Sequence, residues 1–330
     1  MLISEKQQKV IAILADGQFH SGTELAEKLE VSRSAICKQL KKINELGIEF
    51  SAVTGKGYCL KNPLHLLSNA NIEKYLSVEA CSLISVLEIH QSIHSTNSYL
   101  AELAHREQQS GVVCFAEYQT AGKGRRGREW ISPFGSNIYL SILWQFQNGP
   151  ASISGLSLAV GVAVVRALKE CGVQGVGLKW PNDIYWQQKK LAGILIEVSG
   201  EASGPCYAVI GLGLNFYIPK DKAKSITQDW VDLSQILETI PNNLRNKLAA
   251  SLLNHLMPVI ANFEKDGLAH YREAWRIYDC MKGHVVQIYM GEQVFSGIIE
   301  GIDDNGLLLL ADEQGKVNAF ASGEVSFHQL

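Results

Sequence analysis

The chain has 330 residues, a net charge of −3 and 46% hydrophobic residues, which is the composition of a globular protein with room for two or three domains. These values exclude a disordered or a strongly basic chain, so nothing global requires nucleic acid as a partner. We find no signal-peptide pattern and no apolar run that approaches membrane-spanning length, so we expect a cytoplasmic protein without a membrane partner.

Residues 1–62 predict a winged helix-turn-helix domain. Three short helices, the first over about 5–15, precede a hairpin around "TGKG". Ser21 with Glu24 three residues later has the spacing of a capping box for the second helix. Ser32 is the expected N-cap of the third helix.

Cations gather on one face of the third helix and at the tip of the hairpin. Residues 1–61 carry nine Lys and Arg against seven Asp and Glu, whereas the remainder is net acidic. A winged helix places its third helix in the major groove and its wing on phosphate. A three-helix module that only mediates protein contacts is the alternative. The residues expected to contact DNA are Ser32, Arg33, Ser34, Lys38, Gln39, Lys42 and Lys56.

Residues 66–276 follow a linker, "KNPLH" (61–65), and predict a mixed sheet with helices packed against it. Strand-length apolar runs such as "GVVCFAEYQT" and "SNIYLSILWQF" alternate with amphipathic stretches, and "LSLAVGVAVVRALKECG" predicts a long, largely buried helix. We expect Pro258 to kink or divide the helical stretch 242–275.

Residues 277–330 show short alternating strands with turns at "MGEQ", "DDNG" and "DEQGK". This pattern predicts a small β-barrel of SH3-like type. It either caps the central domain passively or takes part in binding ATP or a carrier protein. The chain as a whole is therefore predicted to be an α+β protein of three domains.

The stretch "EYQTAGKGRRGREW" (117–130) places Lys123, Arg125, Arg126 and Arg128 within six residues and separates them with glycines. Such charges repel one another and glycine permits motion, so we expect a loop that becomes ordered around an anion. "AGKGRRG" is not a P-loop, because no Ser or Thr follows the Lys, and "GLGLNF" lacks the third glycine of a dinucleotide fingerprint.

Chemistry-bearing side chains occur at the other strand ends too. Asp183 lies where Pro181 interrupts a strand, and Lys190 opens the strand after the next hairpin. Arg binds phosphate oxygens in a fork and Asp holds Mg²⁺, so this set suits a phosphate-bearing substrate with a divalent metal. A basic tract that binds RNA or DNA is the alternative for the loop alone, but such tracts are usually found on exposed arms.

The motifs "STN", "QTAGKGRRGREW", "KWPNDI", "KLAGILIE" and "GLGLN", in that order, resemble those of the biotin–protein ligases. With the winged helix in front, the chain resembles the bifunctional biotin ligase and biotin-operon repressor family from about residue 5 to its C-terminus. The resemblance implies ATP-dependent biotinylation of a Lys on the biotin carboxyl carrier protein, a subunit of acetyl-CoA carboxylase, through biotinyl-5'-AMP with Mg²⁺.

The resemblance also implies roles for individual residues. Arg125, Asp183 and Lys190 should be catalytic, and Asp183 should hold Mg²⁺. The biotin subsite should contain Ser95, Thr96, Asn97, Gln119, Gly122, Lys123, Gly124, Arg125, Lys190 and Gly193. The adenylate and ATP subsite should contain Arg126, Arg128, Lys179, Asn182, Asn215 and Trp230. Lys123 departs from the family, in which Arg is usual, so the loop keeps the charge but loses the fork geometry there.

By the same resemblance, the adenylate is a corepressor. With it bound, the protein should form a homodimer that presents two winged helices to the operator of the biotin biosynthesis genes. Three alternatives stay open: a lipoyl or octanoyl transferase, a metabolite-sensing repressor without catalysis, and a ligase without operator binding. Seven scattered cysteines without C-x-x-C spacing are expected to be reduced thiols, mostly in the core.

Overall fold

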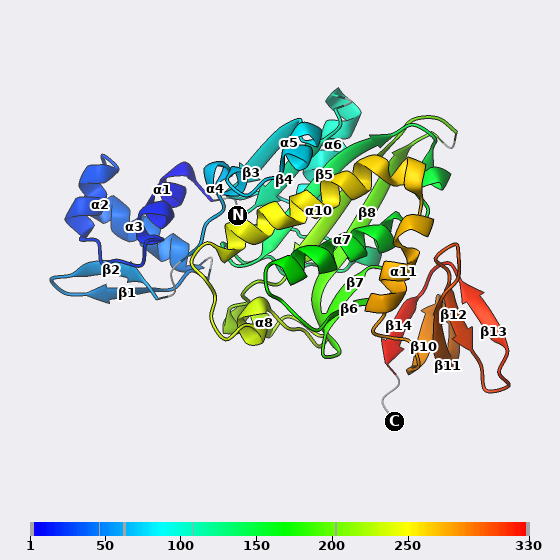
Figure 1. Ribbon diagram of the computed structural model, residues 1–330. Coiled ribbons are helices and arrows are strands. Elements are labelled where there is room, and N and C mark those ends of the chain that lie inside the picture. The colour runs from blue at the N-terminus through cyan, green and yellow to red at the C-terminus, as the bar shows by residue number, and fades with distance from the viewer. Residues whose placement is uncertain (1–2, 46, 62–63, 108, 202, 328–330) are drawn as a thin grey trace.

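The computed structural model describes residues 3–45, 47–61, 64–107, 109–201 and 203–327. A small helical domain lies at one end of a central sheet, and a second, smaller sheet lies at the other end (Figure 1). Residues 62–63 of the predicted linker and the outer limits of the first and last predicted domains lie outside the described residues.

The N-terminal part is a winged helix-turn-helix, as the sequence predicted. Val10, Ile11, Leu25, Ile36 and Leu40 bury the faces on which its helices meet. Its antiparallel hairpin is the wing. The elements are α1 (Glu5–Leu14), α2 (Gly22–Lys28), α3 (Arg33–Glu45), β1 (Phe50–Val53) and β2 (Gly57–Leu60).

Helix capping here differs in part from the prediction. Ser21 caps α2, because its hydroxyl accepts a hydrogen bond from the Glu24 backbone N–H. The Glu24 carboxylate does not return that bond, since it pairs with His20 and Lys28 instead. The predicted capping box is therefore only half formed.

The central sheet has seven strands in the order β3-β4-β5-β9-β8-β7-β6. Only β3 and β4 pair in parallel, and all other neighbours are antiparallel, so the sheet is mixed as predicted. Its strands are β3 (Val86–His90), β4 (Val112–Ala116), β5 (Ile138–Phe146), β6 (Val176–Lys179), β7 (Asp183–Trp186), β8 (Lys189–Gly200) and β9 (Cys206–Leu214).

Helices α7 and α10 cover one face of this sheet, and α6 packs on the other (Figure 1). The segment Pro150–Glu170 is long and apolar enough to cross a membrane by length and composition, contrary to our reading of the sequence. However, 67% of its most apolar window is buried, so it is the core helix of this layer. The helices are α4 (Asn69–Glu73), α5 (Val78–Leu83), α6 (Thr96–Glu107), α7 (Leu156–Glu170), α8 (Lys220–Ala223), α9 (Leu233–Ile236) and α10 (Leu244–Asp266), with 3-10 turns η1 (Arg125–Gly127) and η2 (Pro150–Ile153).

Pro258 does not divide the helix that contains it, so that half of the prediction was wrong. Helix α10 runs without interruption through Pro258 and ends at Gly267, whose φ of 60° closes the helix. Helix α11 (Ala269–Tyr278) follows. Extensive burial of α10 against the sheet and α7 compensates for the backbone hydrogen bond that a proline cannot donate.

The C-terminal sheet is antiparallel throughout, in the order β13-β12-β11-β10-β14. Its strands are β10 (Val285–Met290), β11 (Gln293–Ile302), β12 (Leu308–Ala311), β13 (Val317–Phe320) and β14 (Glu324–Phe327). Within residues 277–327 no pairing joins β13 to β14, so the arrangement is an open form of the SH3-like barrel that the sequence predicted.

A buried ion pair fastens the chain between the first two domains. Glu117 and Arg245 are both fully buried, and Glu117 Oε2 lies 2.6 Å from Arg245 Nη1. Arg245 also donates to the carbonyl of His65, and the Leu67 N–H donates to Glu117. The segment that leaves the wing is therefore anchored to α10 and to the end of β4.

The hydrophobic core of the winged helix continues into the central domain. Phe134 is buried in the same cluster, and Leu64, Leu66 and Tyr118 pack against it. All seven cysteines are free thiols, and Cys37 and Cys81 are exposed rather than in the core. The remaining five are partly or fully buried, as expected of reduced core thiols.

Candidate functional site

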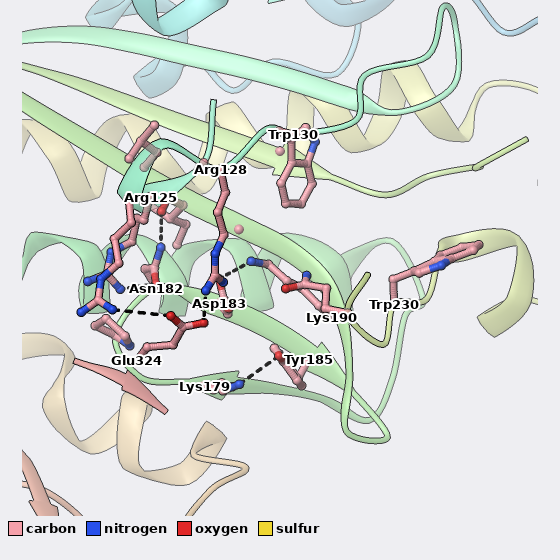
Figure 2. A pocket seen from close by; sticks show the side chains of 18 of the residues that line it. Arg125, Arg128, Trp130, Lys179, Asn182, Asp183, Tyr185, Lys190, Trp230 and Glu324 are labelled. Carbon is pink, nitrogen blue, oxygen red and sulfur yellow. Dashed lines mark hydrogen bonds and ion pairs between the residues drawn. The ribbon is translucent and has the colours of Figure 1, made fainter. Parts of the chain in front are cut away.

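A cleft of about 1640 Å³ opens between the central sheet, the glycine-arginine loop (residues 117–130) and the C-terminal sheet. Figure 2 shows charged side chains from all three converging on it. Of the residues assigned to ligand binding or catalysis, Gly122 alone is missing from the lining. Those that line it are Ser95, Thr96, Asn97, Gln119, Lys123, Gly124, Arg125, Arg126, Arg128, Lys179, Asn182, Asp183, Lys190, Gly193, Asn215 and Trp230.

Gly122 serves the geometry of the loop. A Cβ at this position would lie 2.4 Å from the carbonyl oxygen of Trp130 and 2.5 Å from Ser132 Oγ. The Trp130 N–H donates to the Gly122 carbonyl at 2.9 Å. Glycine here therefore lets the two arms of the loop approach closely.

One end of the cleft is uncharged and polar. It is built where α6 begins and β4 ends. The Thr96 N–H donates to Gln119 Oε1 at 2.9 Å, and Gln119 Nε2 donates to Ser132 Oγ at 3.0 Å. Ser95 and Thr96 are almost fully buried. The Gln119 carboxamide is thus held in one orientation before any ligand arrives.

Asn97 lines this end of the cleft, but its side chain bonds within the protein. Its Nδ2 donates to Glu197 Oε2 at 2.8 Å and lies 3.3 Å from the Leu195 carbonyl. Its Oδ1 is 2.6 Å from the hydroxyl of Ser141, a fully buried residue of β5. Sequence reasoning assigned no role to either residue: Ser141 belongs to no motif, and Glu197 ends the motif "KLAGILIE" without having been assigned one.

Glycines form the floor of the cleft. Gly193 of β8 and Gly213 of β9 face each other in register, and the indole of Trp130 lies over both. A Cβ at Gly213 would lie 2.4 Å from Trp130 Cε2. The two opposed glycines thus let the indole pack directly on the backbones of β8 and β9. Trp130 had no predicted role, although it ends the motif that contains the arginines.

Lys190 and Asp183 form the charged centre of the cleft. Lys190 Nζ lies 2.9 Å from Asp183 Oδ1, and both side chains are less than one-fifth exposed. They come together because β7 and β8 form a tight hairpin, whose turn residues Gln187 and Gln188 have positive φ. Figure 2 shows this pair below Trp130, between the arginines of the loop and Trp230.

Two further cations face the cleft from partly buried positions. Arg125 donates to Asn182 Oδ1 at 3.0 Å, and burial lowers the pKa of its guanidinium. Lys179 Nζ lies 3.0 Å from the Tyr185 hydroxyl, and burial likewise lowers the pKa of this amine. A cation that has lost water gains more from a bound anion than an exposed one does.

The glycine-arginine loop forms ion pairs with a carboxylate of the C-terminal sheet. Arg128 pairs with Glu324, and Arg126 Nη1 lies 3.5 Å from the second oxygen of the same carboxylate (Figure 2). Burial raises the pKa of Glu324, but the hydrogen bond and charge of Arg128 outweigh burial, so the net shift is downward. We expected an anion as the partner of these cations, and the protein supplies one itself.

Trp230 and Asn215 lie next to Lys190. The segment of Trp230 pairs with it as a short bridge, in which the Lys190 N–H donates to the Asp229 carbonyl at 3.0 Å. Asn215 Nδ2 donates to the carbonyls of Lys190 and Val231, so Asn215 joins the two segments. This places the Trp230 indole at the rim of the cleft.

The residues predicted to contact DNA lie on α3, just before it or at the wing, and all but one of them are exposed. Six of them are exposed on α3, just before it, or at the wing: Ser32, Arg33, Ser34, Lys38, Lys42 and Lys56. Gln39 is half-buried, and its Oε1 is buried with no hydrogen-bond partner among the described residues.

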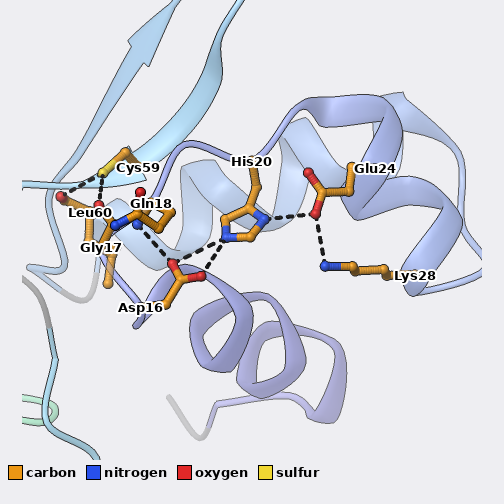
Figure 3. Close-up of polar contacts among 8 residues, drawn as sticks. All are labelled: Asp16, Gly17, Gln18, His20, Glu24, Lys28, Cys59 and Leu60. Carbon is orange, nitrogen blue, oxygen red and sulfur yellow. Dashed lines mark hydrogen bonds and ion pairs between the residues drawn. The ribbon is translucent and has the colours of Figure 1, made fainter.

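The His20 side chain joins Asp16, just after α1, to Glu24 of α2 (Figure 3). Its Nδ1 lies 2.9 Å from Glu24 and its Nε2 lies 3.0 Å from Asp16. Its backbone exchanges two hydrogen bonds with Tyr58 of β2. Burial lowers the pKa of His20, but the two carboxylates outweigh burial and raise it above its ordinary value.

Three protein-family models match this chain. The biotin/lipoate A/B protein ligase family matches residues 89–215, an HTH domain matches 6–59, and the biotin protein ligase C-terminal domain matches 284–328. The fold and the site thus define an enzyme of the ligase class that carries a DNA-binding domain.

Relatives narrow this assignment. The chain is 40% identical to the bifunctional ligase/repressor BirA of Escherichia coli, over 96% of each chain. It is 34% identical to the biotin–[acetyl-CoA-carboxylase] ligase of Mycobacterium tuberculosis, over 72% of this chain and 88% of that one. The chain therefore belongs to the bifunctional ligase/repressors of the biotin–protein ligase family.

A solved structure agrees with the fold. The biotin protein ligase of Aquifex aeolicus, in complex with biotin and ATP, matches with a TM-score of 0.62 at 26% identity, over 75% of this chain and 100% of that one.

Proposed function

We propose that this protein attaches biotin to a lysine of a carrier protein in two steps, and that the intermediate converts it into a repressor. In the first step, a biotin carboxylate oxygen attacks the α-phosphate of ATP and pyrophosphate leaves. In the second step, the lysine ε-amine attacks the acyl carbon, an amide forms and AMP leaves. The observation that carries the proposal is a cleft with a polar end, a glycine floor and a cluster of cations.

The cations address the main barrier of the first step. Carboxylate and triphosphate are both anions, so bringing them together requires positive charge fixed in advance. Lys190 is held by Asp183, and Arg125 is held by Asn182, so both are oriented before the substrates bind. No nucleophile from the protein is required, because biotin supplies the first and the carrier supplies the second.

The remaining residues divide between two subsites. The polar end, with Ser95, Thr96 and Gln119, takes the ureido ring of biotin. The aliphatic chain that joins the rings of biotin to its carboxylate passes over Gly193 and beside Gly122, Lys123 and Gly124. The nucleotide lies along Arg126, Arg128, Lys179 and Asn182, and Asn215 sets the position of Trp230, on which the adenine stacks.

Mg²⁺ fits Asp183 only together with the nucleotide. Among the described residues no three His, Cys, Asp or Glu side chains gather into a metal site. Asp183 has one carboxylate oxygen on Lys190, and the other is available. Mg²⁺ is commonly held by one or two carboxylates, waters and substrate phosphates. When bound, the ion neutralises phosphate charge.

Repression requires the winged helix and a second copy of the chain. We assign residues 1–62 to DNA binding, 66–276 to the ligase and 277–330 to the C-terminal domain. The adenylate-bound form dimerises in the cytoplasm and places two α3 helices on the operator of the biotin biosynthesis genes. The biotin carboxyl carrier protein of acetyl-CoA carboxylase competes with dimerisation by accepting the biotin.

One experiment tests both halves of the proposal. The protein is incubated with Mg·ATP, a biotin-accepting carrier domain and labelled biotin, or labelled lipoate in a parallel arm. Footprinting on DNA upstream of biotin biosynthesis genes then follows, with and without biotin and ATP. Labelling of the carrier by biotin alone, and protection of DNA only with the adenylate, are the expected results. Transfer of lipoate instead, or protection without adenylate, would refute the corresponding half.

A further inference from the structure

Ser141 lies beneath the polar end of the cleft without lining it. It sits in the middle of β5, is fully buried, and belongs to the sheet face on which α6 packs. Its Oγ is 2.6 Å from Asn97 Oδ1 and 2.7 Å from Thr96 Oγ1. Both are short contacts, but a hydroxyl carries a single proton and can donate only one of the two hydrogen bonds.

The surroundings of Asn97 decide where that proton goes. Asn97 Nδ2 faces two acceptors, the Glu197 carboxylate at 2.8 Å and the Leu195 carbonyl at 3.3 Å, and this fixes the orientation of the amide. Oδ1 is therefore the atom that faces Ser141, and an amide oxygen only accepts. The Ser141 hydroxyl must donate to Asn97. The Thr96 hydroxyl then has two acceptors within reach, Ser141 Oγ at 2.7 Å and Gln119 Oε1 at 3.2 Å, and we assign its proton to the shorter contact.

This assignment fixes what the cleft presents to a ligand. With its proton directed to Ser141, Thr96 Oγ1 offers only lone pairs to the cavity. Gln119 Oε1 accepts from the Thr96 N–H and keeps one lone pair, whereas Gln119 Nε2 donates one of its two protons to Ser132. Thr96 Oγ1 and Gln119 Oε1 therefore accept hydrogen bonds from a ligand.

We propose that Ser141, anchored through Asn97 to Glu197, is a positioning residue that fixes this hydrogen-bond polarity and so selects ligands that carry ring N–H donors. The inference rests on the proposed function, in which biotin brings two such N–H groups in its ureido ring. A dithiolane ring, as in lipoate, brings none and leaves the buried acceptors without partners. Each unpaired acceptor costs roughly 10- to 100-fold in affinity.

Gly211 supports this arrangement. It is the register partner of Ser141 on β9, and a Cβ there would lie 2.1 Å from Asn97 Oδ1. Glycine thus makes room for the Asn97 amide above the sheet. The first glycine of "GLGLN" is therefore required for packing of the Asn97 side chain, independently of any bound nucleotide.

The test compares the full-length protein with Ser141→Ala and Ser141→Cys, which change little volume. Ser251→Ala is the matched control, since Ser251 is a buried hydroxyl on α10 that bonds Glu170 far from the cleft. Binding of biotin, and of two analogues that each carry oxygen in place of one ring N–H, is measured by calorimetry. Steady-state carrier biotinylation gives KM and kcat.

We expect Ser141→Ala to raise the Kd and KM for biotin by about 10- to 100-fold, with kcat at saturating biotin within about twofold. Its preference for biotin over one of the two analogues should also shrink at least fivefold, because the freed Thr96 hydroxyl can then donate to the ring oxygen. Ser141→Cys should fall in between, and Ser251→Ala should match the parent.

The ratio of the affinities for biotin and for the analogues distinguishes a change in hydrogen-bond polarity from general structural damage, which would weaken the binding of all three ligands alike. Unchanged preference for biotin over both analogues in Ser141→Ala would overturn the inference while leaving the proposed function intact. If the unaltered protein binds no biotin, the proposed function falls, and this inference falls with it.

Discussion

Replacing Arg245 by Met should strongly destabilise the central domain, because it leaves the buried carboxylate of Glu117 without its ion-pair partner. Glu117 is fully buried, and Arg245 is its ion-pair partner at 2.6 Å. Without Arg245, the carboxylate keeps only the hydrogen bond from Leu67, and the carbonyls of Asn137 and His65 lose their donors.

Breaking a buried pair in this way costs about 3–5 kcal/mol. For a domain of this size each kcal/mol lowers Tm by about 2–4 °C, so the expected loss is roughly 6–20 °C. The double variant Glu117→Gln with Arg245→Met removes both charges and should be the more stable of the two. Glu273→Ala, which breaks an exposed pair with Arg276 on α11, should cost at most about 1 kcal/mol.

Tryptophan fluorescence during thermal and urea unfolding is the appropriate assay. All six tryptophans lie between Trp130 and Trp275, so the signal reports on the central domain and not on the winged helix. If Arg245→Met lost no more stability than Glu273→Ala, or if the double variant were the less stable one, the reasoning about an unpaired buried charge would be refuted.

Three further outcomes are expected. Arg125→Ala should release the adenylate faster in a rapid-dilution assay, because the loop loses its bond to Asn182, and equal retention would count against this role. Lys190→Ala should lower the rate of pyrophosphate release by about 10²- to 10³-fold, and a loss below tenfold would contradict direct stabilisation of charge. The pKa of His20 is raised in the folded protein, so the stability it contributes is present below its ordinary pKa of 6.5 and is lost as pH rises through the raised value. An NMR titration that gives His20 an ordinary or lowered pKa would refute this, and His20→Gln should remove the pH dependence.

The sequence predicted those parts of the fold in which local patterns and tertiary packing agree. The winged helix has caps, apolar stripes and a glycine turn at the expected positions. Pro258 failed as a helix boundary, because burial of α10 outweighs the loss of one backbone hydrogen bond, and Gly267 ends the helix instead. The segment Pro150–Glu170 qualifies as a possible span by length and composition, and its burial in the folded core, which composition does not show, identifies it as a core helix.

The candidate site was predictable where residues belong to motifs, and was missed where contacts join distant segments. The loop cations and Asp183 stand out by type and spacing. Glu324 does not, because 196 positions separate it from Arg128, and it meets that residue only after two domains pack together. Ser141 looks like an ordinary polar residue in a strand. Glycines on alternate positions of neighbouring strands could have indicated the floor beneath Trp130.

The shared cluster around Phe134 has a practical meaning for anyone who divides this chain. A fragment that ends at residue 62 would keep its three helices and wing, yet it would lose Phe134 and the leucines that pack beside it. The apolar surface that this loss exposes would favour self-association. The winged helix is therefore best studied in the full-length protein. Tyr118, which packs against the core of the winged helix, is followed directly by Gln119 of the ligand cleft.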